Sequence, residues 1–501
     1  MTVDEQLIFR GDTIADRNSL RAVATSMCWT TGSTIFLVVA ATVLNLIIGN
    51  VFGDEGLGVY SLAVAIYLFL GTVAGLGQYV ALVKYTAEYI DEPHLEREYF
   101  GASLILAGTA GLLTGTVLLV LSGSLARFFC MPDLAEFLVI LSIAVPFFEL
   151  NKVGLAHLAG LRRMRAFAVG ESLRYVFAIL ATIAGVVWYP ERLCLTVVAL
   201  LIAEIMLAFY VAHVTRLHRS ASLRNFRARA GELLRFGVQV VFLRIMGEMD
   251  SRLDLAVTGY FLSQGEVGTY SVGLMLARGL TVFPNALQKI ALPLMAELYA
   301  KKRLSALENF INQAMQVMAV ILTLAAITMA ALFPQIILLL YPKQDVFLSA
   351  RPAFNVLLAG FVFRGIGMTI VSIFASVGRP DVELKTAPVT LAVNFVVAIV
   401  LAVSGWGMPG IAAGTAASGI IAFALWTVLT HPVVGVKVHY WRLLVMPLLG
   451  LGVGVVIMLL APYVSTLILI IPFIGLLCLV ALRLYRFDLL AARLFRPPHS
   501  G

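Results

Sequence analysis

Charged side chains interrupt two adjacent hydrophobic segments that lie between Leu243 and Tyr299. A charge at the centre of a bare membrane helix costs about 2.5 to 3.5 kcal/mol, so such residues normally face a bundle interior or a watery cavity. Arginine suits phosphate binding in such a place, because its planar fork pairs bidentately with phosphate oxygens. This stretch is therefore the first candidate for a substrate path, and anion binding is the chemistry that it favours.

The first of these segments carries two polar stripes. Arg244, Glu248 and Arg252 recur every four residues and share one helix face. Asp250 and Asp254 form a second stripe, nearly opposite. At least one stripe must then face a neighbouring helix or lie at the level of a loop. Asp254 is close to the predicted external end, where solvation or capping of the next segment is an equal alternative.

Further cations follow in the second half of the chain. Arg278, Asn285 and Lys289 share a face of the next segment. Arg364 has no acid beside it in its span, so we expect its partner to come from another helix or from substrate. Five of the seven in-span cations lie in this half, against three acids, and the second half should therefore supply the anion-binding wall. The predicted substrate-binding residues are Arg244, Arg252, Arg278, Lys289, Arg364 and Asn285.

The first half carries charges that are easier to pair. Glu149 and Lys152 are three residues apart on one predicted helix and can neutralise each other. Glu171 and Arg174 have the same spacing, so a structural ion pair is expected there too. Glu204 lacks a local partner and must be protonated or bonded across helices, which makes it a candidate for proton coupling. The predicted ion-coupling or charge-pair residues are Glu248, Asp250, Asp254, Glu204, Glu149, Lys152, Glu171 and Arg174.

The composition is that of an integral membrane protein. Hydrophobic residues make up 60% of the 501 residues and charged residues only 13%, against roughly 45 to 50% and 25% in soluble domains. The polar first twenty residues predict no cleavable signal peptide. The net charge of +8 is explained by cytoplasmic loops, so nucleic acid is not an expected partner. No metal or cofactor is expected, and free thiols are favoured over a disulfide between Cys130 and Cys194.

Fourteen segments are apolar enough to cross a bilayer, which takes about 20 residues. They lie near 25–49, 57–79, 99–123, 136–157, 168–188, 193–215, 234–259, 266–290, 308–333, 350–375, 384–404, 410–430, 443–461 and 465–484. With Lys and Arg at the span edges counted in the adjoining loops, the termini and the loops on their side hold 25 of these residues, against four in the opposite loops. The positive-inside rule then places both termini in the cytoplasm. The sequence thus predicts an all-α multi-pass protein of the cytoplasmic membrane.

Two copies of one pattern divide the chain. Leu44-Asn45-Leu46 followed by GLGVYSLA at 56–63 matches Leu253-Asp254-Leu255 followed by EVGTYSVG at 266–273, at offsets of 209 and then 210 residues. Each copy contains six spans and begins at the cytoplasm, so two parallel lobes should be related by a pseudo-two-fold axis along the membrane normal. The predicted parts are an N-terminal segment with an interfacial helix (1–24), an N-lobe (25–215), a basic cytoplasmic linker (216–233), a C-lobe (234–430), two extra helices (443–484) and a cytoplasmic tail (485–501).

The repeated motifs resemble a known transporter family. FGDEGLGVYSLAVAIYLFLGTVAGLGQYVALVKYTAEY at 52–89 is similar to the first loop and second helix of Wzx-like polysaccharide flippases, a branch of the multidrug/oligosaccharidyl-lipid/polysaccharide exporter superfamily. The resemblance covers about residues 20–485. It implies that an isoprenoid-diphosphate-linked oligosaccharide moves from the inner to the outer leaflet through a cavity between two lobes, without a cofactor. The implied partners are this lipid-linked sugar, membrane lipids and, as a further candidate, polysaccharide polymerase machinery.

Three other interpretations stay open at this point. A peptidoglycan-precursor flippase also has fourteen helices and an anionic lipid substrate, but its branch gathers cations in the first lobe. A cation-coupled multidrug exporter commonly relies on an acid in its first helix, where residues 25–49 offer only Asn45. A membrane glycan polymerase or ligase usually carries a long external loop rich in Arg and His, and the loops predicted here are short. No catalytic motif appears at an external face, so enzyme activity is not expected.

Overall fold

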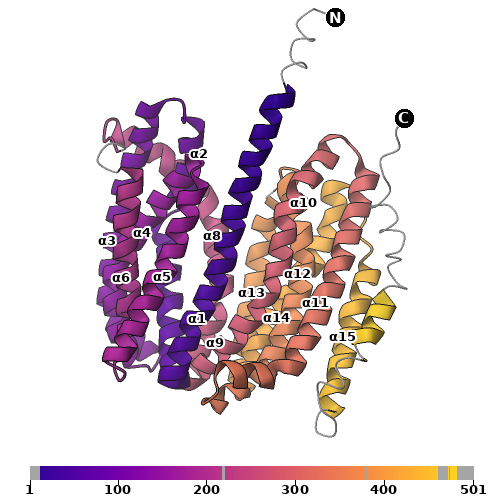
Figure 1. Cartoon of the computed structure of the whole chain (residues 1–501). Helices are drawn as coiled ribbons and strands as arrows, with labels where there is room; N and C mark the ends of the chain where they lie inside the picture. Colours follow the sequence, from indigo (N-terminus) through magenta and orange to yellow (C-terminus); the bar gives the residue numbers. More distant parts are fainter. Residues whose placement is uncertain (1–11, 217–220, 380, 461–471, 473, 482–501) are drawn as a thin grey trace, which may run out of the picture. The chain divides into compact units, whose positions relative to one another are not determined.

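The computed structural model of the protein describes residues 12–216, 221–379, 381–460, 472 and 474–481. These residues form helices joined by short turns, and they contain no β-strand (Figure 1). Eight of the described helical segments are long and apolar enough to cross a membrane. The predicted all-α multi-pass membrane architecture is confirmed.

The chain folds into two compact units whose boundaries cut across two helices. Of the described residues, unit 1 contains those up to Phe52 and Ala63–Ile245, and unit 2 contains Gly53–Leu62 and those from Met246 onward. The boundary between the units therefore falls inside helix α8 (Phe226–Phe261) instead of in the basic linker. A short piece near the start of the chain belongs to unit 2.

Unit 1 is built on six helices and the first part of α8. They are α1 (Asp12–Ala74), α2 (Gln78–Glu88), α3 (Pro93–Phe128), α4 (Asp133–Gly160), α5 (Met164–Trp188) and α6 (Leu195–Thr215). The predicted first two spans form one helix, α1, which is kinked at Gly53 with a φ of 70° that glycine adopts without strain. Residues 14–24, predicted as a separate interfacial helix, are continuous with α1. A second glycine with positive φ, Gly77, separates α1 from α2.

Unit 2 holds the rest of α8 and the later helices. They are α9 (Gln264–Arg278), the 3₁₀ turn η2 (Gly279–Thr281), α10 (Val282–Ala300), α11 (Leu304–Leu340), η3 (Asp345–Ala350), α12 (Arg351–Ser376), α13 (Asp381–Val403), α14 (Gly407–Val434) and α15 (Tyr440–Leu460). The predicted span 266–290 is broken at η2, because Pro284 in the first turn of α10 has no N–H to continue the helical hydrogen bonds. The predicted span 465–484 lies largely outside the described residues.

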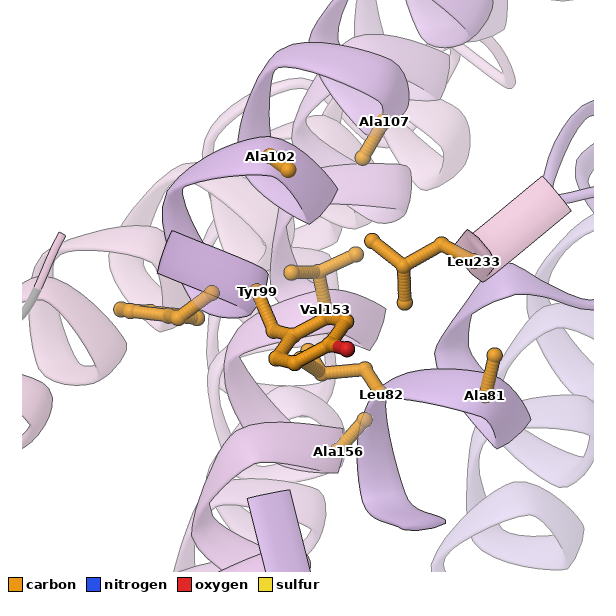
Figure 2. Packing of buried hydrophobic residues seen from close by; sticks show 9 residues of the cluster. Ala81, Leu82, Tyr99, Ala102, Ala107, Val153, Ala156 and Leu233 are labelled. Atoms are coloured by element: carbon orange, nitrogen blue, oxygen red, sulfur yellow. The ribbon is translucent and has the colours of Figure 1, made fainter. Parts of the chain in front are cut away.

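Leu233 attaches the first part of α8 to unit 1. Figure 2 shows its side chain among buried residues of α2, α3 and α4, which include Leu82, Tyr99 and Val153. The ring of Tyr99 stacks on Tyr85 at a centroid distance of 4.6 Å. This packing buries apolar surface from four helices at once, so the start of α8 is held by the core of unit 1.

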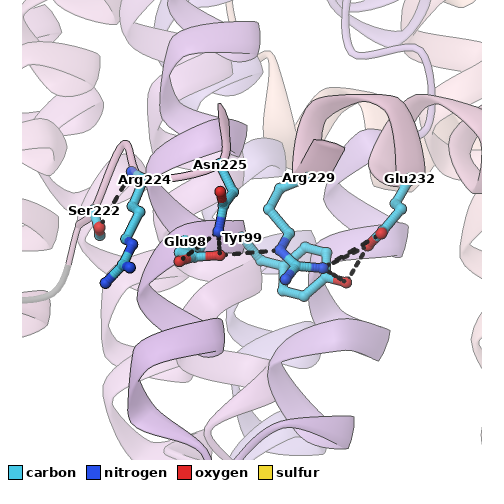
Figure 3. A network of polar contacts seen from close by, with 7 residues as sticks. All are labelled: Glu98, Tyr99, Ser222, Arg224, Asn225, Arg229 and Glu232. Carbon is cyan, nitrogen blue, oxygen red and sulfur yellow. Dashed lines mark hydrogen bonds and ion pairs between the residues drawn. The ribbon is translucent and has the colours of Figure 1, made fainter. Parts of the chain in front are cut away.

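Polar contacts fix the linker to the beginning of α3 (Figure 3). The Ser222 N–H donates to the carbonyl of Arg97 at 2.9 Å. The Arg229 guanidinium lies 3.1 Å from the Glu98 carboxylate and 3.2 Å from that of Glu232. Burial alone would lower the pKa of Arg229, but the hydrogen bonds to these carboxylates raise it above its ordinary value. The linker is thus an ordered part of unit 1 from Ser222 onward.

Candidate functional site

The most informative charged pair of unit 2 joins Arg364 on α12 to Asp250 on α8. Arg364 Nη1 lies 2.5 Å from Asp250 Oδ2. Asn394 on α13 and Ser418 on α14 also donate to Asp250 Oδ1, each at 3.4 Å. The Asp250 side chain is 7% exposed, whereas that of Arg364 is 31% exposed. The carboxylate is therefore anchored by three helices, while the guanidinium keeps accessible surface that a ligand can contact.

The partner of Arg364 comes from another helix, which is one of the two sources that the sequence left open. A second arginine of α8, Arg252, pairs with Glu248 one turn earlier, with Nε 2.8 Å from Oε1. Both of these side chains are 25% exposed. Each arginine is neutralised by a neighbour without being covered by it.

Arg278 ends α9 and contacts the middle of α8. Its guanidinium donates a short hydrogen bond to the carbonyl of Ser251. Asn285 is exposed on α10, beyond the η2 turn. The helix face predicted to carry Arg278, Asn285 and Lys289 is therefore not continuous, because the helix breaks between the first two. The side chain of Lys289 lies outside the described part of the structure.

Asp254 is buried, with 1% exposure, so solvation at a helix end does not describe it. Its Oδ1 accepts the Leu255 N–H at 3.0 Å, and its Oδ2 has no hydrogen-bond partner. The Tyr270 hydroxyl lies between Asp254 and Thr415, and neither it nor the Thr415 hydroxyl, both buried, makes a hydrogen bond of ordinary geometry. Oδ1 of Asn394 is a further unpartnered buried oxygen in this unit. Buried oxygens without partners are costly, and a proton or a small cation would satisfy them.

Unit 1 contains a pair of cations on one aromatic ring. The Arg244 guanidinium lies 5.0 Å from the centroid of the Tyr79 ring, and the Lys152 Nζ lies 4.9 Å from the same centroid. Lys152 also pairs with Glu149 at 3.2 Å, as predicted. Its Nζ donates to the carbonyl of Gly71 at 3.0 Å, near the end of α1, and the same carbonyl also accepts the Gly75 N–H at 3.2 Å.

Arg244 differs in two respects from its predicted place. Its contacts group it with unit 1, whereas the sequence assigned it to the anion-binding wall of the second half. Helix α8 is shared by the two units, and its sequence alone does not show where one unit ends and the other begins. Its side chain is exposed, and no ion pair to it occurs among the described residues. Arg244 is therefore a cation whose charge has not been neutralised by a neighbouring acid in the described structure.

The close ion pair of Arg174 is not with the predicted Glu171. Arg174 instead pairs across helices with Glu204, with Nε 3.0 Å from Oε1. The Asn151 side-chain amide donates to Glu204 Oε2 at 2.7 Å. Glu204 is 4% exposed and Arg174 19%, so this is an ion pair inside unit 1. The reason for the difference is that α5 and α6 pack together. This packing brings the Glu204 carboxylate of α6 within ion-pair distance of Arg174 on α5.

Cys130 and Cys194 are free thiols. Within the described ranges, no group of three or more His, Cys, Asp and Glu side chains is arranged to hold a metal ion. Sequence reasoning missed the neutral partners Tyr79, Asn394 and Ser418. Asn394 gave a usable signal, because an amide inside the apolar segment 384–404 must find a partner.

Comparisons with known proteins extend these observations. The model of the family described as "Polysaccharide biosynthesis protein" matches residues 23–299, and the MatE family model matches residues 249–403. A curated protein of Shigella flexneri, "Putative O-antigen transporter", is 21% identical over 340 residues, which are 66% of this chain and 79% of that protein.

Solved structures share the fold. The lipid II flippase MurJ in an inward closed conformation matches with a TM-score of 0.75 and 16% identity, over 93% of this chain and 100% of that one. A multidrug resistance MATE family transporter in an inward-facing conformation matches with a TM-score of 0.70 and 16% identity, over 80% and 94% of the two chains. At these identities the likeness concerns the fold alone.

Proposed function

The chain belongs to the polysaccharide biosynthesis protein family, and on this premise we propose that it is a flippase of the cytoplasmic membrane with both termini in the cytoplasm. Its substrate is an isoprenoid-diphosphate-linked oligosaccharide used for cell-surface polysaccharide, which it moves to the outer leaflet by alternating access. The name of the Shigella relative supports a transporter of this kind. The protein has no enzymatic step in this proposal, because the sugar lipid crosses unchanged.

The ion pair of Arg364 with Asp250 is the observation that carries the proposal. A diphosphate headgroup crossing the membrane needs cations that replace its water and then release it. Arg364 meets both needs, because its side chain is 31% exposed and Asp250 neutralises it when no phosphate is present. Asp250 lowers the affinity of Arg364 for the phosphate, so that the phosphate can leave, and a fully buried guanidinium could not reach it. Arg252 with Glu248 repeats this arrangement on α8.

Arg244 is the second proposed contact of the diphosphate. It is exposed and has no acidic partner among the residues that the structure describes, and its guanidinium lies over the Tyr79 ring, 5.0 Å from the centroid. Arg278, Lys289 and Asn285 remain predicted contacts. Of these, Arg278 is tied most closely to the protein, through its hydrogen bond to the Ser251 carbonyl.

We assign ion coupling to Asp254 in preference to Glu204. Asp254 Oδ2 lies near the Tyr270 hydroxyl and makes no hydrogen bond of ordinary geometry, whereas both Glu204 oxygens are engaged by Arg174 and Asn151. A carboxylate that must exchange a proton or a cation needs an oxygen left free for it. Substitution of Asp254 by Asn should abolish the dependence of transport on an ion gradient while a downhill exchange of substrate persists.

Reconstitution tests the function directly. The purified protein is placed in vesicles with a labelled isoprenoid-diphosphate oligosaccharide, and the leaflet and chemical identity of the label are followed. We expect a change of leaflet without chemical change, and about a tenfold or greater loss of rate in Arg364→Ala and Arg244→Ala. The matched control is Arg379→Ala, because Arg379 also pairs with an aspartate, Asp381, but lies on an exposed surface. Unaltered transport in both test variants, at normal protein levels, would defeat the phosphate role.

One structural observation favours a second candidate, a peptidoglycan-precursor flippase. The sequence argued against it because the cations gathered in the second half, but Arg244 and Lys152 share an aromatic ring in unit 1. The two candidates differ in the sugar and share the lipid diphosphate. Competition between unlabelled lipid-linked oligosaccharide and lipid-linked peptidoglycan precursor in the same vesicles decides between them, since the true substrate suppresses transport of the label.

A further inference from the structure

A cavity separate from the charged residues lies within unit 2, between α11, α12 and α15. Its volume is about 180 Å³. Most of its wall is apolar and much of it is small. The wall includes Ala326, Ala330, Leu358, Ala359, Val362 and Gly450. Close-packed interiors rarely leave such a space empty, because every lining atom then loses its dispersion contacts.

One end of the cavity is polar. Arg351 and Asn355 lie one helical turn apart on α12 and both line it. The Nε of Arg351 and both polar atoms of the Asn355 side chain are buried and have no hydrogen-bond partner. No ion pair to Arg351 occurs in the described part of the chain. A buried donor left unpaired costs about 1 to 3 kcal/mol, so this end is incomplete without an acceptor, and a negatively charged acceptor suits arginine best.

The polar and apolar parts are arranged as a lipid requires. Along α12 the cavity extends from Arg351 to Phe363, which is roughly 18 Å at 1.5 Å per residue. That length is close to one leaflet of the hydrocarbon core, about 15 Å. The predicted topology puts Arg351 at the external side, so the polar end lies at the headgroup level of the outer leaflet.

We propose that this cavity binds one anionic phospholipid of the outer leaflet, with its phosphate on Arg351 and Asn355 and an acyl chain along the apolar wall. The charge of Arg351 selects an anionic headgroup, and the small apolar side chains leave the space for the acyl chain. This site is independent of the proposed flippase function, because none of its residues belongs to the proposed substrate contacts.

The bound lipid would also join α15 to the rest of unit 2. A Cβ added to Gly450 on α15 would lie 2.2 Å from the Thr323 side chain of α11, so these two helices already touch beside the cavity. Pro447 and Leu451 of α15 complete the wall on that side. A chain between α11, α12 and α15 contacts all three helices, and its removal should loosen α15.

Native mass spectrometry and thermal unfolding of the purified, delipidated full-length protein test the proposal. The added probes are phosphatidylglycerol, phosphatidylcholine with the same acyl chains, and inorganic phosphate. We expect one tightly bound phosphatidylglycerol, a rise in unfolding temperature on its addition, at least about tenfold weaker binding of phosphatidylcholine, and no effect of phosphate alone. Equal binding of the two lipids, or stabilisation by inorganic phosphate alone, would overturn the assignment to an anionic lipid.

Two variants and one control separate the parts of the site. Arg351→Gln should weaken phosphatidylglycerol about tenfold and bring its affinity to that of phosphatidylcholine. Ala359→Phe fills the channel and should abolish lipid binding with Arg351 intact, which keeps the proposal testable if Arg351→Gln does not fold. Arg127→Gln is the matched control, because Arg127 is an exposed arginine at the same predicted side whose bonds go to Gly123 and Ser124 of its own helix. Unchanged binding in Ala359→Phe would show that the lipid lies elsewhere.

Discussion

Gly58 and Gly268 hold the same position in the two copies of the repeated motif, and their backbones pack against each other. A Cβ on Gly58 would lie 2.0 Å from the carbonyl oxygen of Gln264 and 3.0 Å from the amide nitrogen of Gly268. A Cβ on Gly268 would lie 1.9 Å from the carbonyl oxygen of Asp54 and 2.9 Å from the amide nitrogen of Gly58. The contact is self-complementary in the way that a two-fold interface is, which explains why both copies keep glycine there.

Substitution of these glycines should destabilise the protein in a non-additive way. Gly58→Ala and Gly268→Ala each force the same two backbones apart, which should cost about 1 to 3 kcal/mol. Once the backbones have separated, the second methyl group adds little, so the double variant should cost clearly less than the sum of the single variants. Thermal or denaturant unfolding in detergent measures all three.

The control for this contact is Gly123→Ala. Nothing lies within 4 Å of a Cβ at Gly123, which is inside helix α3, so alanine should leave stability unchanged or raise it by up to about 1 kcal/mol. Additive losses in the Gly58 and Gly268 double variant would show that the two glycines do not share one contact.

The ion pair of Arg174 with Glu204 makes a second prediction about stability. Glu204→Leu leaves a mostly buried guanidinium without its carboxylate, which should cost about 3 to 5 kcal/mol. Adding Arg174→Met should recover most or all of that loss, because a buried ion pair can be replaced by apolar side chains at little net cost. Unfolding of the single and double variants measures this recovery. A single variant as stable as the parent protein would contradict the prediction.

The double variant also separates structure from coupling. If transport in vesicles remains dependent on an ion gradient once stability is recovered, Glu204 serves the fold, as its full set of partners indicates. If stability returns while gradient dependence is lost, coupling passes through Glu204 and the assignment to Asp254 fails.

The sequence was most informative for features that depend on a single helix, such as a membrane span or an ion pair between two residues of that helix. The apolar segments identified most of the described helices, and a spacing of three residues identified the pair of Glu149 with Lys152. It failed where two helices compete for one side chain, because periodicity describes a single helix. Arg174 therefore pairs with Glu204 and not with the predicted Glu171, and Arg244 groups by its contacts with unit 1 although the sequence placed it with the second half. The repeat of Gly58 and Gly268 was visible, but only the packed structure shows that the two copies touch each other.

Neutralisation of Asp250 should change how the protein handles an anionic substrate. In Asp250→Asn the amide oxygen can still accept from Asn394 and Ser418, while Arg364 loses its counter-charge. We expect the lipid diphosphate to bind about two- to fivefold more tightly, in line with an ion pair worth up to ~1 kcal/mol because Arg364 is partly exposed. Release should slow correspondingly, so the transport rate at saturating substrate falls.

Equilibrium binding and the rate of leaflet exchange, measured on the same preparation, check both effects. Asp381→Asn is the control, because Asp381 also pairs with an arginine, Arg379, but at an exposed site, and it should change neither quantity. Weaker binding in Asp250→Asn would mean that Asp250 positions Arg364 for the phosphate instead of competing with it.

The contacts of Arg229 should hold the linker against unit 1. Arg229 joins Glu98 on α3 to Glu232 on α8, and the carbonyl of Ser222 lies where a Cβ on Gly101 would be only 2.2 Å away. Arg229→Ala removes the cation between two carboxylates and leaves them facing each other, so the segment before α8 should detach. Limited digestion with proteinase K should then cut the linker several times faster than in the parent protein, because exposed, locally unfolded backbone is what the protease needs.

Arg227→Ala is the control, since Arg227 is exposed and makes no ion pair within the described residues. Equal cleavage of the two variants would show that other contacts hold the linker.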